Sequence, residues 1–232
     1  MGERRNINGL ILIAVFAIPM GLMAFLYLFT EQVHDRVPYE YDIVENGDTL
    51  FHELPVFQLV NLDGDTLGRD DLLPYVTIID FFSLEKDSLN VRTVLHGNLE
   101  RTYRNIEWDR QPKPPIRFIS ISTGDSPEAL KAYASKREEV DVDNWWILRG
   151  SPEEVYKLGA YTFQLMDFSR KTAQSEPFTA QQVALVDREG KVRKYYVGTD
   201  LIEERKIQED LINLFKQDYP GVWDIRREVA GE

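Results

Sequence analysis

The stretch TIIDFFSLEKDSLN, residues 77–90, decides the fold class. Its first half is almost entirely apolar up to Phe82, as expected for a strand that is buried on both faces of a sheet. A polar corner runs from Ser83 to Ser88, and a helical spacing of apolar residues begins at Leu89. A strand that leads directly into a helix is the repeating unit of an α/β fold.

Further strand and helix units follow on the C-terminal side of this stretch. The pairs Ser126-Pro127 and Ser151-Pro152 predict two helix starts, because serine caps a helix N-terminus and proline is tolerated in the first turn. The predicted order is a hairpin at 56–67, strands at 75–82, 116–122 and 144–150 with a helix after each, a hairpin at 181–198 and a helix at 200–216. This order predicts an α/β protein of thioredoxin-like fold, with a central mixed sheet flanked by helices.

Residues 9–29 contain no charged side chain. At a rise of about 1.5 Å per residue they reach roughly 30 Å, the thickness of the hydrocarbon core of a bilayer, and so predict one N-terminal transmembrane helix. A cleaved signal peptide fits less well, because its apolar core is usually about 7–15 residues long and no small-residue cleavage motif follows Phe29. Arg4 and Arg5 precede the apolar run, which places the N-terminus in the cytoplasm and the rest of the chain outside.

These patterns divide the chain into five predicted segments. They are a cytoplasmic N-terminus at 1–8, a transmembrane anchor at 9–29, a charged tether at 30–53, a thioredoxin-like domain at 54–218 and a C-terminal tail at 219–232. Since no mitochondrial-type presequence precedes the anchor, we expect a single-pass protein of the bacterial inner (cytoplasmic) membrane, with its C-terminal domain in the periplasm.

Composition excludes several classes of function. The net charge of −12 argues against a nucleic-acid partner, whose phosphates attract basic surfaces. The chain has no cysteine, so it can form no disulfide, use no thiol as a nucleophile and offer no thiolate to a metal.

Five blocks of the sequence, together covering roughly residues 54–216, resemble the Sco/SenC family of membrane-anchored thioredoxin-like proteins. The blocks are FQLVNLDGDTL, TIIDFFS, RFISISTGDSPEALKAYA, GSPEEVYKLGAY and VALVDREGKVRKYYVG. The resemblance implies a role in delivering copper to cytochrome c oxidase or in managing its thiols.

The same resemblance implies a site made of a Cys-x-x-x-Cys at the strand-to-helix corner and a distant histidine, which together suit Cu(I). In a gapless alignment the cysteine positions fall on Glu85 and Leu89, and the histidine position falls on Thr179. The other candidate ligands, which lack metal-binding spacing, are His34, His52, His96 and Met166. We therefore expect a degenerate family member without metal or other cofactor.

The favoured function is non-enzymatic docking to a membrane partner in the assembly or stability of a cytochrome c oxidase or related respiratory complex. Trp145 and Trp146 are the candidate docking residues. Because consecutive strand residues point to opposite faces, we expect one of them in the core and the other at the surface.

The alternative function is a thiol-independent enzyme or a ligand-sensing domain that uses Glu85 and its neighbours, or the long connection at 162–180. Against a catalytic role, carboxylates at a helix N-terminus are favoured by the helix dipole alone. Ser83 also has no histidine near it in the sequence to activate it, which argues against a nucleophilic triad.

Overall fold

The computed structural model describes residues 15–24, 36–43, 48–73, 75–85, 90–106, 115–137, 144–159 and 179–219. The chain forms two compact units, 1–35 and 36–232. In the first unit, residues 15–24 are helical, and the rest of the predicted span, 9–14 and 25–29, lies outside the described residues. Among the described helices, none combines the length and the apolar character needed to cross a membrane.

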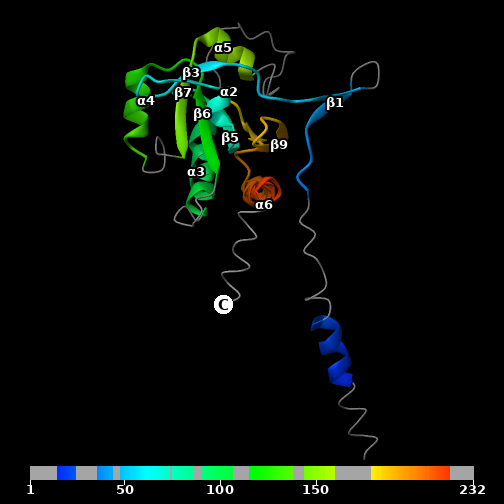
Figure 1. Cartoon of the computed structure of the whole chain (residues 1–232). Helices are drawn as coiled ribbons and strands as arrows, with labels where there is room; N and C mark the ends of the chain where they lie inside the picture. The colour runs from blue at the N-terminus through cyan, green and yellow to red at the C-terminus, as the bar shows by residue number, and fades with distance from the viewer. Residues whose placement is uncertain are drawn as a thin grey trace, which may run out of the picture. The chain divides into compact units, whose positions relative to one another are not determined.

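The second unit is built on a seven-stranded mixed sheet with the order β4-β3-β7-β6-β5-β8-β9 (Figure 1). The strands are β3 (Gln58–Val60), β4 (Thr66–Gly68), β5 (Val76–Phe82), β6 (Ile116–Ser122), β7 (Trp145–Arg149), β8 (Gln182–Val186) and β9 (Val192–Val197). β5, β6 and β7 run parallel, whereas β8 pairs antiparallel with β5 and β9 antiparallel with β8. The predicted mixed sheet is confirmed, with its central parallel strands joined by helical crossovers.

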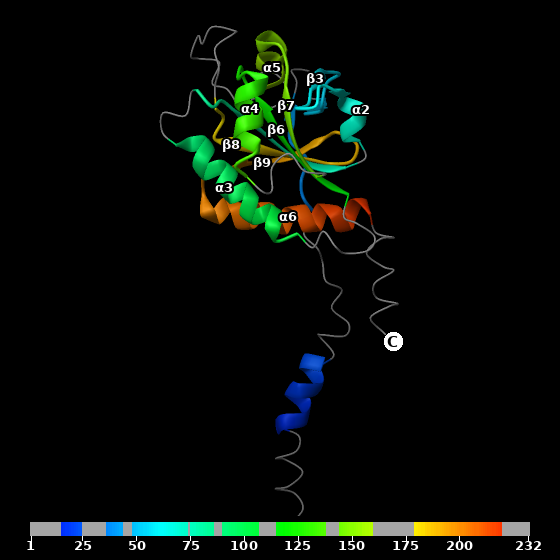
Figure 2. The ribbon, with the colours of Figure 1, turned by 90° about the vertical axis from the view of Figure 1, so that its left-hand side faces the viewer.

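Helices cover both faces of this sheet. They are α2 (Arg69–Leu72), α3 (Val91–Arg104), α4 (Pro127–Ala134), α5 (Pro152–Lys157) and α6 (Leu201–Asp218). α3, α4 and α6 pack their apolar side chains into one cluster with one sheet face, and α2 and α5 contribute to a second cluster on the other face. Figure 2 shows α3 and α6 side by side, in agreement with their contacts.

The predicted serine caps are confirmed. The hydroxyl of Ser126 accepts a hydrogen bond from the Ala129 amide at 3.2 Å, and that of Ser151 accepts one from the Glu154 amide, also at 3.2 Å. Each cap satisfies one of the free amides in the first turn of its helix. Helices α4 and α5 therefore start where the sequence indicates.

The N-terminal boundary of the domain differs from the prediction. Residues 30–53 were expected to be a tether, but Arg36 and the residues after it belong to the compact domain. Two short strands, β1 (Tyr41–Ile43) and β2 (Thr49–Phe51), pair antiparallel in this segment. The sequence pattern did not predict these strands, because each is only three residues long and lies in a stretch of charged residues.

Candidate functional site

The corner after β5 is held by residues that precede β8. Ser83 is fully buried, and its amide donates to the Thr179 hydroxyl at 3.0 Å. The amide of Ala180 donates to the carbonyl oxygen of Phe81 at 2.9 Å. The structure thus brings Thr179 to the corner, although 96 residues separate it from Ser83.

The next two amides of the corner also have acceptors inside the protein. The amide of Leu84 lies 3.0 Å from both carboxylate oxygens of Asp125, and that of Glu85 donates to the Ser83 hydroxyl at 3.1 Å. The Ser122 hydroxyl donates to the same Asp125 carboxylate at 2.8 Å. The amides of 83, 84 and 85 are therefore used for structure and do not form an oxyanion-binding set.

A buried polar cluster lies behind the corner, and sequence reasoning missed it. Asp80 in β5 receives hydrogen bonds on both carboxylate oxygens, from His96 Nε2 in α3 at 2.9 Å and from Ser120 Oγ in β6 at 2.5 Å. Trp145 Nε1 in β7 donates to Ser120 Oγ at 3.0 Å. The second imidazole nitrogen, His96 Nδ1, contacts the hydroxyl of Tyr133 in α4. This network joins three strands and two helices.

The donors and acceptors of this cluster match one arrangement of protons. With a hydrogen on Nε2, His96 donates to the Asp80 carboxylate, and its Nδ1 is left as an acceptor for the Tyr133 hydroxyl. Arg137 donates to the Tyr133 oxygen at 2.9 Å. Burial raises the pKa of Tyr133, which favours the neutral phenol that donates its hydrogen. A neutral imidazole thus satisfies every group in the chain of bonds.

The remaining predicted site positions are only partly described. Glu85 is exposed at the end of the described corner. Leu89 lies outside the described residues, as do Lys86, Asp87 and residues 162–178 of the long connection. Within the parts of the chain that the structure describes, no group of three or more His, Cys, Asp or Glu side chains is placed to hold a metal ion.

Comparison with protein-family models and with curated proteins gave no match. Among solved structures, a SCO1/SenC family lipoprotein from Bacillus anthracis str. Ames has a TM-score of 0.56 and 27% identity, covering 71% of this chain and 96% of its own. The resemblance to the Sco/SenC family is confirmed. BsSco, a Sco family member with an identified disulfide switch, has a TM-score of 0.56 and 24% identity, covering 73% of this chain and 96% of its own. Copper-bound ScoI from Arabidopsis thaliana has a TM-score of 0.54 and 17% identity, covering 70% and 98%. These last two show a shared fold.

The corner of this Sco/SenC-like chain does not fit a Cu(I) site. Copper(I) prefers thiolate and thioether ligands, and no cysteine exists anywhere in the sequence. Among the residues described there, the side chains that the corner offers are the hydroxyls of Ser83 and Thr179 and the carboxylates of Asp125 and Glu85. These are hard oxygen donors, and three of the four already serve as hydrogen-bond acceptors for corner amides.

The two tryptophans expected to serve in docking have different surroundings. Trp145 is fully buried in the core, so it contributes nothing to a docking surface. Trp146 is half-buried, and the guanidinium of Arg117 lies 3.5 Å from its ring centroid. The same guanidinium lies 3.6 Å from the ring of Tyr75, so it is enclosed between two aromatic faces. One face of Trp146 is thereby covered within its own domain.

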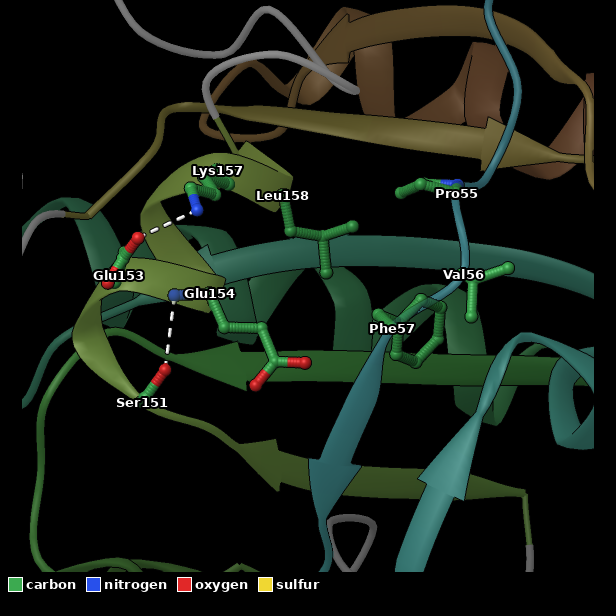
Figure 3. A pocket seen from close by; sticks show the side chains of 8 residues that line it. All are labelled: Pro55, Val56, Phe57, Ser151, Glu153, Glu154, Lys157 and Leu158. Carbon is green, nitrogen blue, oxygen red and sulfur yellow. Dashed lines mark hydrogen bonds and ion pairs between the residues drawn. The ribbon is translucent and has the colours of Figure 1, made fainter.

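A groove of about 690 Å³ lies between α5 and the chain that leads into β3 (Figure 3). Its lining residues are Pro55, Val56, Phe57, Ser151, Glu153, Glu154, Lys157 and Leu158. Figure 3 shows the Glu154 side chain between α5 and Phe57, and its carboxylate accepts the Gln58 amide at 2.8 Å. Glu153 pairs with Lys157 at 2.7 Å. None of these residues belongs to the corner.

Replacing Thr179 by valine tests how much the corner depends on its hydroxyl. Thr179→Val keeps the side-chain shape but removes the acceptor of the buried Ser83 amide, and we expect a loss of about 1–2 kcal/mol in unfolding free energy. Urea unfolding of the full chain in detergent micelles measures this loss, and hydrogen exchange at Ser83 locates it. Thr179→Ser retains the hydroxyl and is the matched control. An equal loss in both variants would show that methyl packing, not the hydrogen bond, holds the corner.

Proposed function

We propose that this chain is a membrane-anchored, extracytoplasmic Sco/SenC-like protein that docks to a cytochrome c oxidase or a related respiratory complex during its assembly or stabilisation. It acts without enzymatic activity and without carrying copper. The observation that supports this most directly is a corner whose described amides and oxygen atoms maintain the fold, in a chain that has no cysteine to bind Cu(I). BsSco belongs to a family of cytochrome c oxidase assembly proteins, which supplies the partner class.

The anchor in this proposal is residues 9–29. Their uncharged sequence supports a membrane span, and Arg4 and Arg5 on its N-terminal side support a cytoplasmic N-terminus. The domain from Arg36 onward then faces the periplasm. This arrangement holds the domain at the surface where the extracytoplasmic parts of respiratory complexes are assembled.

An apolar docking surface lies at the start of α6 and α3. Leu201 and Ile202 are 62% and 68% exposed, and Val94 and Val197 are 45% and 40% exposed. The segments that carry them meet where the turn after Val197 packs on α3, since the Asn98 side-chain amide donates to the Gly198 carbonyl at 2.8 Å. Apolar side chains gathered at a surface are typical of sites that bind another protein.

This surface lies near the strand that forms one side of the corner. The Gly198 amide donates to the Gln181 carbonyl at 2.8 Å, two residues after Thr179. We propose that Val94, Val197, Leu201 and Ile202, which we name the α6 patch, contact the respiratory partner. The half-exposed face of Trp146 is the second docking candidate.

The proposal predicts that charge in the α6 patch weakens docking. Leu201→Asp combined with Ile202→Asp should reduce co-purified respiratory subunits about tenfold or more, since each buried Leu or Ile is worth about 1.5–3 kcal/mol. Aspartate is compatible with the first turn of a helix, so α6 should stay folded. The measurement is quantitative mass spectrometry of the tagged, full-length protein purified in mild detergent from its own membranes.

Two control variants make this experiment specific. Ile212→Asp changes another exposed isoleucine of α6 and should leave the respiratory subunits in place. Glu85→Gln should leave both docking and oxidase content unchanged, whereas a loss of oxidase with intact docking would favour the enzymatic alternative. If deletion of the whole protein left oxidase content and activity unchanged, the proposed function would be rejected.

A further inference from the structure

The hairpin of β1 and β2 carries an exposed aromatic face. Tyr39, Tyr41 and Phe51 are 39%, 52% and 39% exposed. Tyr41 pairs directly with Phe51 across the two strands, and the ring of Phe51 meets Tyr39 and Tyr41 edge to face at centroid distances of 5.4 and 6.2 Å. We name Tyr39, Tyr41 and Phe51 the hairpin aromatic face.

This face is fixed to the domain by main-chain hydrogen bonds. The Glu40 amide donates to the Val192 carbonyl at 3.0 Å, and the Val192 amide donates to the His52 carbonyl at 2.8 Å. The Leu54 amide donates to the Gly190 carbonyl at 2.8 Å. Beneath Tyr39, the guanidinium of Arg193 lies 3.9 Å from the ring centroid. The three rings are therefore presented in a set direction by the body of the domain.

Chain length keeps the hairpin aromatic face close to the end of the apolar run. Tyr39 follows Phe29 by ten positions in the sequence. Even a fully extended chain of that length reaches only about 35 Å. The face therefore stays within reach of any membrane that residues 9–29 span.

We propose that the hairpin aromatic face inserts into the headgroup boundary of the membrane and sets the orientation of the domain on it. The proposal rests on the anchor in the proposed function. Tyrosine is favoured at this boundary because its ring is apolar and its hydroxyl is polar. Three exposed rings on one face of a hairpin offer the apolar area that interfacial binding requires.

The charge of the protein favours an apolar contact with lipid over an electrostatic one. The full chain has a net charge of −12, which opposes attraction to anionic lipids, so the rings must supply the affinity. Lys191 places one cation beside the rings: its ammonium lies 5.5 Å from the centroid of Phe51 and 5.7 Å from that of Tyr39, and it pairs with the half-exposed Glu189 at 3.6 Å. It can meet a lipid phosphate while the rings enter below it. The contact should persist in neutral lipid and in high salt.

Because the chain has no native cysteine, a single introduced cysteine can be labelled with a fluorophore without labelling at any other position. Thr49→Cys places one label on the strand face of Phe51, two residues away, and leaves all three rings in place. Ala132→Cys labels the exposed side of α4, which Figure 1 shows on the far side of the domain from β1. Val15→Cys labels the helical segment of the anchor. Each full-length variant carries a fluorophore in phosphatidylcholine nanodiscs that contain lipids with a quencher near the headgroup.

We expect the Thr49 label to be quenched at least about twofold more than the Ala132 label, in low and in high salt, as for an apolar interfacial contact. Tyr41→Ser with Phe51→Ser should return the Thr49 label to the Ala132 level with only a small fall in the urea midpoint, because both rings are partly exposed. Equal quenching of Thr49 and Ala132 beside a quenched Val15 would overturn this inference and leave the proposed function intact. An unquenched Val15 would overturn the anchor and the inference together. Shielding of Thr49 that requires added respiratory complex would assign the face to protein docking and overturn lipid contact.

Discussion

Asp80→Ala should lower the free energy of unfolding by about 2–5 kcal/mol, because each buried hydrogen-bond donor left without its acceptor costs about 1–3 kcal/mol. The Asp80 carboxylate is the common acceptor of His96 and Ser120, and all three side chains are at most 1% exposed. Without it, two buried donors lose their acceptor in a place that water does not reach. The substitution therefore removes the side-chain hydrogen bonds that join β5 to α3 and β5 to β6.

Urea unfolding of the full chain, followed by tryptophan fluorescence, measures this loss. Trp145 reports directly, because its indole nitrogen donates to Ser120 in the same network. Asp80→Asn keeps one acceptor oxygen and should cost clearly less than Asp80→Ala. Combining Asp80→Ala with His96→Phe should show a coupling of about 0.5–3 kcal/mol, as for residues in one network. Additive losses would mean that Asp80 and His96 stabilise the fold independently.

The hydrophobic pattern predicted the existence of α3 but not all of the face that it buries. Leu95 and Leu99 are buried, as their helical spacing of four residues indicates, whereas the apolar Val94 beside Leu95 is 45% exposed. Buried positions are taken instead by His96 and Asn98. Periodicity treats such polar residues as solvent-facing, and only their partners on distant elements, Asp80 and the Gly198 carbonyl, explain their burial.

One local signal did point to the buried network. Asp80 interrupts a strand that is otherwise almost free of charge, and a carboxylate there requires hydrogen-bond donors. The sequence does not reveal which donors meet it. His96 is 16 positions away and Ser120 is 40 positions away, and both arrive through the parallel pairing of β5 with β6 and the packing of α3.

At the corner, the family resemblance directed attention to Thr179, and the structure places that residue on the Ser83 amide. The role of Asp125 as the acceptor of the Leu84 amide at the corner was not predicted. It lies just after β6, whose C-terminal end is adjacent to that of β5 because the strands are parallel, and that adjacency explains its contact with Leu84. Short strands such as β1 and β2 stayed hidden, because three residues carry too little alternation to be recognised.

Arg193→Ala should cost about 3–5 kcal/mol, because it leaves a buried charge without its partner. Arg193 is 5% exposed, and its guanidinium lies 3.4 Å from the carboxylate of Asp187, which is 2% exposed. The same guanidinium donates to the Pro38 carbonyl at 3.2 Å and to the Val37 carbonyl. The substitution therefore breaks an ion pair and also frees the first segment of the domain.

Hydrogen exchange separates these two effects. Global destabilisation raises exchange throughout the sheet, whereas release of the segment at 37–40 should raise exchange first at the Glu40 amide, which is bonded to Val192. Arg193→Lys keeps the charge but lacks the forked geometry that reaches two carbonyls and a carboxylate, so it should lose less global stability than alanine while still exposing Glu40. If Glu40 stayed protected in both variants, the main-chain bonds to β9 would be sufficient to hold the hairpin. If the Glu40 amide instead exchanged faster in both variants, Arg193 would be needed to hold Tyr39, and with it the hairpin aromatic face, in position against the domain.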